Sequence, residues 1–281
     1  MEKISSQNDR AISFLSQHHS PEVLVLPNAW DAASAMIFVH EGFRAIGTTS
    51  AGIAASLGYA DGERMTSAEN LEVARRIINQ TDLPVSVDFE SGYAHDADGV
   101  ARGALALIQA GAVGLNIEDS PKDSQTALSE ISLQQDKIRA IRETAEKTGV
   151  RLVINARTDA YLLGDTTKDS LRESIRRGNA YVEAGADCVF VPDMDNLESS
   201  DIKCLAAEID APINVIAGAS MPGLAKLQEL GVSRVSLGPR PMRALLGLLR
   251  EIAQEIRSQG SFELMSSDSI SYAEVNSWFS D

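Results

Sequence analysis

The sequence predicts one α/β domain folded as a (β/α)8 barrel (a TIM barrel), and three observations favour that fold. The chain has 281 residues, close to the usual length of a one-domain α/β barrel. Short apolar runs alternate with longer helical segments. Most of these runs lack polar alternation, which is typical of strands buried on both faces of a parallel sheet. An open doubly wound sheet is the alternative, but no GxGxxG motif follows the first strand.

Eight apolar runs are expected to form the barrel strands. They lie at residues 23–29, 45–50, 85–90, 114–119, 152–159, 188–193, 213–218 and 234–239. One helix is expected before the first strand, at about residues 4–18, and others between the strands at 67–80, 96–112 and 170–186.

Polar and glycine residues mark the ends of these helices. Ser67 is expected to cap the helix at 67–80. Gly111, Gly185 and Gly231 each precede a predicted strand, at the position where a left-handed glycine ends a helix. The helix–glycine–strand unit recurs along the chain, as a (β/α) repeat requires.

The chain is expected to divide into a barrel at residues 1–258, including its N-terminal helix, and a tail at 259–281. The tail ends in SYAEVNSWFS, a short amphipathic helix with Trp278 and Phe279 on or near one side. A terminal helix with exposed aromatic side chains docks either on a neighbouring subunit or on its own barrel.

Composition limits the partners and the compartment. The formal net charge is −15, with a pI of about 4.7, which disfavours binding to nucleic acid or to an anionic membrane. The sequence has no signal peptide that we can recognise and no run of about 20 apolar residues. Cys188 and Cys204 lack CxxC spacing and are expected to be buried, reduced thiols. We therefore expect a soluble, cytoplasmic protein.

Acidic residues gather where the predicted strands end, which in an α/β barrel is the active-site face. Asp88 and Glu90 are two residues apart and are expected to project from the same face of their strand. The other polar strand-end residues are Thr48, Thr49, Ser50, Glu118, Asp119, Arg157 and Asp159, and Asp61 lies in the loop that follows Ser50. Converging carboxylates repel one another unless a cation offsets them, and hard oxygen ligands favour Mg²⁺ or Mn²⁺. One isolated acid would instead cap a helix or pair with a basic residue.

Other residues near these strand ends are candidates for binding and proton transfer. Arg157 either clamps a substrate carboxylate or forms a salt bridge with Glu118 or Asp159. Tyr93 and His95 lie in the loop after the third strand, where they could reach a substrate.

The remaining histidines give no catalytic pattern. His18, His19 and His40 are expected on helix surfaces away from the mouth, and the sequence has no GxSxG motif, so a hydrolase triad has no support. Zinc is disfavoured because His and Cys are missing near these strand ends.

Six segments resemble the isocitrate lyase/phosphoenolpyruvate mutase superfamily. In family order they are PNAWDAASA (27–35), TTSAGIAASLGYADGE (48–63), VSVDFESGYA (85–94), GLNIEDS (114–120), INARTDA (154–160) and VSLGPRPMRALLG (235–247). They cover nearly the whole chain, and the first two are similar to the large lyase-like branch of the superfamily.

The resemblance implies a role for each matching residue. Asp88 would bind the metal directly, and Glu90, Glu118 and Asp61 would hold its water shell. Arg157 would bind the substrate carboxylate. Thr49, Ser50 and Ala51 fall where the family binds that carboxylate, partly through backbone amides. The family also implies a last helix swapped between subunits, in a homotetramer or homodimer.

One departure from the family bears on function. Isocitrate and methylisocitrate lyases carry a KKCGH loop after the fourth strand, whose cysteine is the catalytic acid/base. Here the segment after Glu118 reads DSPKDSQTALSEIS, in which Lys122 faintly resembles the gating-loop lysine of the phosphoenolpyruvate mutases.

The resemblance with this departure implies a Mg²⁺-dependent lyase for a small 2-oxo or 2-hydroxy carboxylic acid. It would cleave or form a C–C bond through a metal-stabilised enolate. The alternatives are a phosphonopyruvate-type P–C mutase or hydrolase and a non-catalytic oxo-acid-binding protein.

Overall fold

The computed structural model describes residues 2–120, 128–163, 167–192, 197–267 and 269–280. Within these ranges, nine parallel strands form one sheet, in the order β1-β9-β8-β7-β6-β5-β4-β3-β2. The strands are β1 Leu24–Leu26, β2 Asn28–Ala29, β3 Ile46–Thr48, β4 Val85–Asp88, β5 Gly114–Glu118, β6 Val153–Arg157, β7 Cys188–Phe190, β8 Ile213–Ile216 and β9 Arg234–Ser236.

The ends of this sheet meet at Pro27. Proline cannot donate a ladder hydrogen bond, and it separates β1 from β2. β1 pairs with β9 while β2 pairs with β3, so the two pieces act as one strand that closes the barrel. The predicted (β/α)8 barrel is confirmed.

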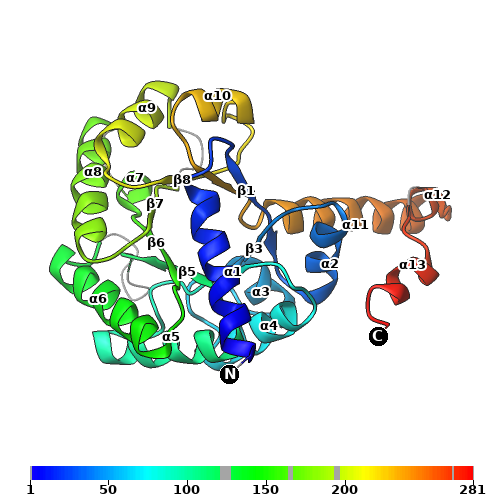
Figure 1. The fold of residues 1–281 in the computed structure, drawn as a ribbon. Coiled ribbons are helices and arrows are strands. Elements are labelled where there is room, and N and C mark those ends of the chain that lie inside the picture. The colour runs from blue at the N-terminus through cyan, green and yellow to red at the C-terminus, as the bar shows by residue number, and fades with distance from the viewer. Residues whose placement is uncertain (1, 121–127, 164–166, 193–196, 268, 281) are drawn as a thin grey trace.

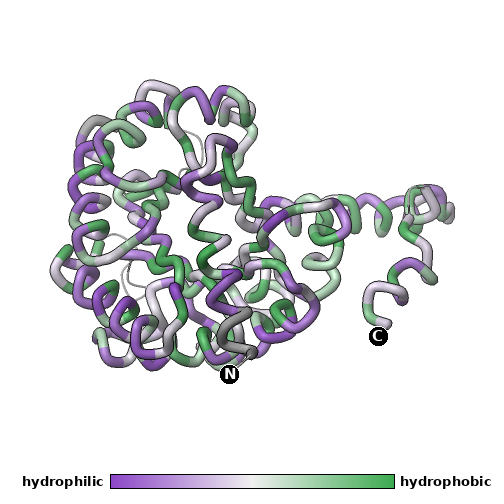
Figure 2. The backbone as a smooth tube through the Cα atoms, viewed as in Figure 1, coloured by the Kyte–Doolittle hydropathy of each residue, from purple (hydrophilic) through white to green (hydrophobic). Residues whose placement is uncertain are grey.

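Helices surround the barrel (Figure 1). They are α1 Glu2–His18, α2 Ala32–His40, α3 Ser50–Leu57, α4 Ser67–Asn79, α5 Ala97–Ala110, α6 Ile131–Thr148, α7 Ala160–Leu163, α8 Thr167–Glu183, α9 Ser199–Glu208, α10 Leu224–Glu229, α11 Arg240–Gln259, α12 Glu263–Ser266 and α13 Tyr272–Ser277. Figure 2 shows hydrophilic and hydrophobic residues mixed along the outer helices, as expected for elements with one buried face.

The helix ends follow the predicted chemistry with one correction. Gly111, Gly185 and Gly231 have φ of 104°, 111° and 90°, in the left-handed region that suits glycine. The N-cap of α4 is Thr66, not Ser67. The Thr66 hydroxyl accepts from the Glu69 amide at 3.2 Å, and the Glu69 carboxylate accepts from the Thr66 amide at 2.8 Å. This reciprocal capping box places the first helical residue one position later than the cap.

Helix α1 packs against the barrel and buries His18, which the sequence analysis expects at the surface. Phe14 has no exposed surface, and His18 packs edge-on against its ring at 4.7 Å. The prediction that His18 lies at the surface is wrong, because the last turn of α1 faces the protein interior. His18 Nδ1 bonds the Phe14 carbonyl at 2.8 Å, and burial, together with nearby Arg234, lowers the pKa of His18 to about 3. Cys188 is buried as expected, whereas Cys204 is only half-buried.

The C-terminal part departs from the barrel. Helix α11 projects away from it, and α12 and α13 follow at the far end (Figure 1). Trp278, just after α13, lies 5.4 Å from the His40 ring of α2, so the end of the tail contacts its own barrel. Of the helices within the described ranges, none is long and apolar enough to cross a membrane.

Candidate active site

Asp88 ends β4 at the barrel mouth, and neighbouring elements hold it on three sides. Its amide donates to the Thr48 hydroxyl at 2.8 Å, and its carbonyl accepts from the Asn70 side chain at 3.0 Å. One carboxylate oxygen, Oδ2, accepts from the Ser50 amide at 2.9 Å, at the start of α3. Among the described residues this amide is the only donor to the Asp88 carboxylate. The backbone is therefore fixed while the carboxylate keeps capacity for a further ligand.

Glu90 follows β4 in a strained backbone. Its φ is 48°, which a residue with a side chain adopts only when its surroundings enforce it. Its carboxylate accepts from the Tyr93 hydroxyl at 2.6 Å and from the Glu63 amide at 2.8 Å. Since β4 ends at Asp88, strand alternation does not relate Glu90 to Asp88, and that reason for their shared face was wrong.

Arg157, at the end of β6, is enclosed by two acids. Its Nη1 lies 2.9 Å from Glu118, and its Nε and Nη2 donate to Asp159 at 2.6 and 3.1 Å. Burial alone would lower the pKa of Arg157, but Asp159 and Glu118 outweigh it and raise the pKa. The salt bridges with Glu118 and Asp159, which the sequence analysis gives as one alternative for Arg157, are therefore present in the structure. Its Cζ also lies 5.8 Å from the centre of the Phe190 ring.

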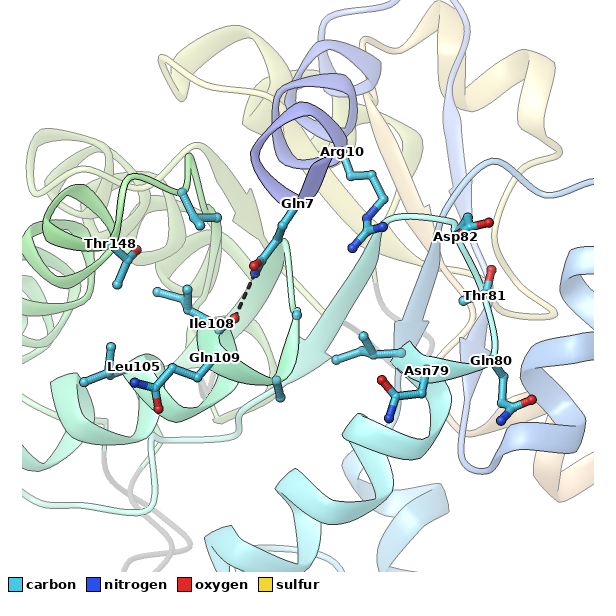
Figure 3. Close-up of a pocket in the computed structure, with 14 residues that line it drawn as sticks. Gln7, Arg10, Asn79, Gln80, Thr81, Asp82, Leu105, Ile108, Gln109 and Thr148 are labelled. Atoms are coloured by element: carbon cyan, nitrogen blue, oxygen red, sulfur yellow. Dashed lines mark hydrogen bonds between the residues drawn. The ribbon is translucent and has the colours of Figure 1, made fainter. Parts of the chain in front are cut away.

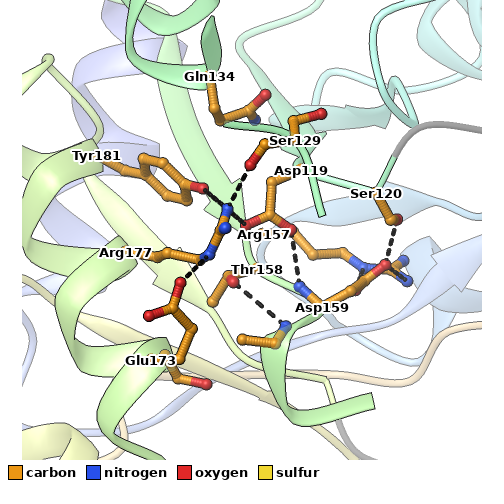
Figure 4. Close-up of polar contacts among 12 residues, drawn as sticks. Asp119, Ser120, Ser129, Gln134, Arg157, Thr158, Asp159, Glu173, Arg177 and Tyr181 are labelled. Carbon is orange, nitrogen blue, oxygen red and sulfur yellow. Dashed lines mark hydrogen bonds and ion pairs between the residues drawn. The ribbon is translucent and has the colours of Figure 1, made fainter. Parts of the chain in front are cut away.

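Asp119 is directed away from this group and forms a closed polar network (Figure 4). Its carboxylate accepts from the Tyr181 hydroxyl at 2.7 Å, from Arg177 Nη1 at 3.1 Å and from the Asp159 amide at 2.9 Å. Arg177 also donates to the Ser129 carbonyl at 2.8 Å. Burial raises the pKa of Asp119, although these donors oppose the shift. The network joins β5 to α8, so Asp119 has a structural role.

The segment at the start of α3 offers fewer free amides than expected. The Thr49 amide donates to the Ala29 carbonyl at 3.1 Å, and the Ser50 amide is bound to Asp88. The Thr49 hydroxyl caps α3 by accepting from Gly52 at 3.4 Å. Ala51, in the first turn of α3, keeps an amide that no other described residue accepts.

The other candidates are placed less centrally. Asp61 is exposed, and its carboxylate lies 3.4 Å from the Ser50 hydroxyl. His95 is exposed on the loop before α5. Lys122 lies outside the described residues. Burial and the neighbouring Glu90 raise the pKa of Tyr93, which keeps the phenol protonated and donating to Glu90.

The sequence reasoning missed two groups near the mouth, the half-buried Glu63 and the buried Lys137. The Glu63 carboxylate accepts from the Ser91 amide at 3.0 Å, from the Ser91 hydroxyl at 2.7 Å and from the Tyr93 amide at 3.0 Å. Lys137 of α6 is 4% exposed and donates to the Ser91 carbonyl at 2.9 Å. Burial lowers the pKa of Lys137. Only the acidic end of the ADGE segment hinted at Glu63, and no local signal pointed to Lys137.

The donor set limits the kind of metal site that this mouth can form. Within the described ranges, no three His, Cys, Asp or Glu side chains are grouped closely enough to hold a metal among them. Glu90 and Glu118 already have protein partners, whereas Asp88 has an oxygen to spare. These residues fit a Mg²⁺ ion that keeps most of its water, as Mg²⁺ commonly does. They do not fit a dehydrated metal held by several side chains.

A cavity of about 780 Å³ lies at the opposite end of the barrel (Figure 3). The helix-to-strand connections at 79–82, 109–111 and 148–150 line it together with Gln7 and Arg10 of α1. Its wall mixes apolar and polar side chains, and the Gln7 side chain donates to the Ile108 carbonyl at 2.9 Å. Because catalytic groups of this fold lie where strands end, the mouth around Asp88 remains the candidate active site.

Comparison with known sequences finds a matching family and several related proteins. The sequence model of the phosphoenolpyruvate phosphomutase family matches residues 14–257. An uncharacterized protein of Mycobacterium tuberculosis is 41% identical over 241 residues, which cover 83% of this chain and 84% of that protein. The 2-methylisocitrate lyase of Halalkalibacterium halodurans is 30% identical over 274 residues, which cover 94% of this chain and 87% of the lyase.

Solved structures show the same fold. A candidate lyase/mutase of Burkholderia cenocepacia has a TM-score of 0.90 and 32% identity, over 98% of this chain and 97% of that chain. A candidate phosphonomutase of the same organism has a TM-score of 0.84 and 38% identity, over 88% and 100%. A phosphonopyruvate hydrolase, solved with oxalate and Mg²⁺, has a TM-score of 0.84 and 23% identity, over 96% and 94%. At that identity the last likeness concerns the fold alone.

Proposed function

Because the chain is an enzyme that belongs to the isocitrate lyase/phosphoenolpyruvate mutase superfamily, we propose that it is a Mg²⁺-dependent carbon–carbon lyase. Its substrate would be a small 2-oxo or 2-hydroxy carboxylic acid. The named 2-methylisocitrate lyase relative supports this reaction class, and the Asp88 carboxylate, which has an oxygen to spare, supports the metal. Mn²⁺ would serve as an alternative ion.

The observation that carries the proposal is the environment of Asp88. Thr48 and Asn70 fix its backbone, and a single amide at the start of α3 orients its carboxylate. A preorganised carboxylate with capacity to spare suits a direct metal ligand. Glu90, Glu118 and Asp61 would hold the ion through water. The bound ion would supply a Lewis acid for negative charge that develops on the α-oxygen of the substrate.

The other residues of the mouth would bind and orient the substrate. Arg157 has five N–H groups, and its bonds to Glu118 and Asp159 use three of them. The remaining donors would bind the substrate carboxylate, together with the amide of Ala51 and the Ser50 hydroxyl. The two acids hold the guanidinium plane in place, so it would lose little side-chain entropy when substrate binds.

The proton-transfer group is drawn from Tyr93, His95 and Lys122. Tyr93 donates to Glu90 and resists ionisation, which suits a hydrogen-bond donor better than a general base. His95 is exposed and would need to move toward the substrate. Lys122 lies two residues after Ser120 in the sequence and remains the third candidate.

A screen of C3 to C6 oxo and hydroxy acids with Mg²⁺, read out for a 2-oxo acid product, tests this function. We expect turnover of at least one acid, and its loss in EDTA and in Asp88→Ala. If Asp88→Ala leaves both metal binding and turnover unchanged, the proposal fails. Ligand binding that EDTA abolishes, with no acid ever turned over, would instead indicate a non-catalytic oxo-acid-binding protein.

Phosphonopyruvate chemistry is the second candidate, and the candidate phosphonomutase at 38% identity favours it. ³¹P NMR of phosphonopyruvate incubated with the protein and Mg²⁺ separates the two reactions. A persistent substrate signal, alongside turnover of an oxo or hydroxy acid, would exclude P–C cleavage or transfer.

We also propose that the chain forms a homo-oligomer, a dimer or a tetramer, through α11. This helix projects from the barrel with four leucines 45–59% exposed, namely Leu245, Leu246, Leu248 and Leu249. An exposed apolar face of this kind is costly in water and marks a contact surface. Light scattering of the native chain and of a Leu246→Glu, Leu249→Glu variant would test it. A native monomer would contradict the proposal.

A further inference from the structure

Arg234 is a buried cation in β9 without an acidic partner. Arg234 is 1% exposed. No ion pair within the described ranges includes it. Its Nη2 donates to Asn116 Oδ1 at a long 3.4 Å, while Nε and Nη1 have no hydrogen-bond partner in the part of the chain that the structure describes. Its Cζ lies 5.9 Å from the centre of the Phe14 ring.

Polar side chains with unpaired atoms surround this cation. Asn214 Nδ2, Asn155 Oδ1 and Ser86 Oγ are buried and lack a partner among the described residues. Asn116 links the group, because its Oδ1 also accepts from Asn155 Nδ2 at 2.7 Å. Asn214 is the register partner of Arg234 on the adjacent strand. The five residues come from five strands, so they meet in the barrel interior.

The walls of this polar core lie close together. A Cβ added at Gly114 would stand 3.1 Å from the Ser86 hydroxyl and 2.9 Å from Phe14 Cε1. Since Phe14 also lies against Arg234, these contacts join the Ser86 side of the core to the Arg234 side. This close packing excludes a large ligand on the Ser86 side of the core.

Energetics point to a negatively charged ligand. Leaving a cation buried and unpaired is strongly unfavourable, and contact with an aromatic face recovers only part of that cost. Burial lowers the pKa of Arg234 to about 10, so it still carries its charge at neutral pH. The unpaired groups are mainly donors: two on Arg234, one on Asn214 and the Ser86 hydroxyl. A water molecule could satisfy some of these hydrogen bonds but would leave the charge uncompensated.

We propose that the barrel core contains a binding site for a small monovalent anion of halide size, held by Arg234 Nε and Nη1. Asn214 Nδ2 and the Ser86 hydroxyl complete the donor set. This anion site shares no side chain with the cation site at Asp88, although the Asp88 carboxylate is near enough to raise the pKa of Arg234. It acts as a structural site that offsets the buried guanidinium and stabilises the folded barrel.

Crystals of the full chain grown with bromide in place of chloride test the site directly. We expect an anomalous bromide peak within hydrogen-bond distance of Arg234 Nε or Nη1. A peak of water height with no anomalous signal at this position would overturn the proposal. This experiment uses the native chain and does not depend on any variant folding.

Thermal unfolding in solution gives the second test. At constant ionic strength, replacing gluconate by chloride or bromide should raise the Tm of the native chain by about 5 °C at roughly a hundredfold excess over Kd, because the anion binds only the folded state. Arg234→Met and Asn214→Leu should lose most of this shift. Arg75→Met, which removes a half-exposed cation of α4, should keep it. A shift that is absent in the native chain, or retained in full by Arg234→Met, would contradict the site.

Discussion

Two aspartates at the ends of neighbouring strands have opposite surroundings. Asp88 follows β4 and receives one backbone amide on its carboxylate. Asp119 follows β5 and receives a phenol, a guanidinium and an amide, with no exposed surface. Both are strand-end acids in sequence. Protein partners satisfy Asp119 fully, while Asp88 is oriented and retains capacity for an external ligand.

The difference indicates that strand-end acids of one barrel face can have different roles, a structural one for Asp119 and a ligand-binding one for Asp88. Asp119 faces the helix layer, where Arg177 and Tyr181 of α8 reach it (Figure 4). Asp88 faces the mouth, where its charge acts on Arg157, which is itself engaged by Glu118 and Asp159. We therefore expect substitution of Asp119 to destabilise the protein and substitution of Asp88 to inactivate it.

Asp88→Asn should give the largest effect on function. The amide oxygen can still accept from Ser50, but the negative charge for the metal is gone. We expect kcat/KM to fall by about a thousandfold and Mg²⁺ affinity to fall at least tenfold. The free energy of unfolding should change by less than about 1 kcal/mol. Steady-state kinetics, metal titration calorimetry and urea unfolding would measure the three quantities. Near-native kinetics with native metal affinity would break the comparison.

Asp119→Ala should give the largest effect on stability. It removes one of the two acids that pair with the buried Arg177, leaving only Glu173, and it removes the acceptor of Tyr181. We therefore expect a loss of about 3 kcal/mol in the free energy of unfolding. Arg176→Ala is the matched control, because it breaks an exposed pair with Glu173 and should cost less than about 0.5 kcal/mol. Urea unfolding would check both, and equal losses in the two variants would contradict a structural role for Asp119.

Removal of Mg²⁺ should change the Tm of variants at Asp88 and at Asp119 differently. A ligand that binds only the folded state stabilises it by about 2.7 kcal/mol at a hundredfold excess over Kd. We expect Mg²⁺ to raise the Tm of the native chain, and EDTA to reverse the rise. Asp88→Asn should show no rise, while a folded Asp119→Asn should retain it. Differential scanning calorimetry would reveal a reversed pattern if the metal instead used Asp119.

Tyr93→Phe should give the smallest of these effects. The change removes one hydrogen bond to Glu90, for which we expect about 1 kcal/mol in stability and a rate decrease of about tenfold or less. If Tyr93 transferred the proton itself, kcat would fall by at least about a hundredfold. Single-turnover kinetics on the two proteins would distinguish a supporting residue from an acid.

The sequence predicted the barrel because its strands are short apolar runs bounded by glycine-ended helices. It also located Asp88, Glu118 and Arg157, since strand ends meet at one face whatever the loops do. Residues whose partners lie far away in the sequence were harder to predict. Glu63 and Lys137 converge on Ser91 from other parts of the chain, and no local pattern records that meeting.

Backbone conformation explains the other differences. The two-residue period of a strand predicts side-chain direction only within the strand. Glu90 lies beyond the end of β4 and has a positive φ. His18 was assigned to the surface from its position on a helix, but the packing of α1 against Phe14 buries it. Neither the turn after β4 nor the docking of α1 follows from local periodicity.

A crystal structure of the full chain with Mn²⁺ and oxalate would test the central claim most directly, because Mn²⁺ scatters anomalously. We predict one metal ion at the mouth, bonded to an Asp88 carboxylate oxygen at about 2.1 Å. Glu90, Glu118 and Asp61 should reach it through water. A metal bound by three or more protein side chains, or one that makes no contact with Asp88, would contradict the account.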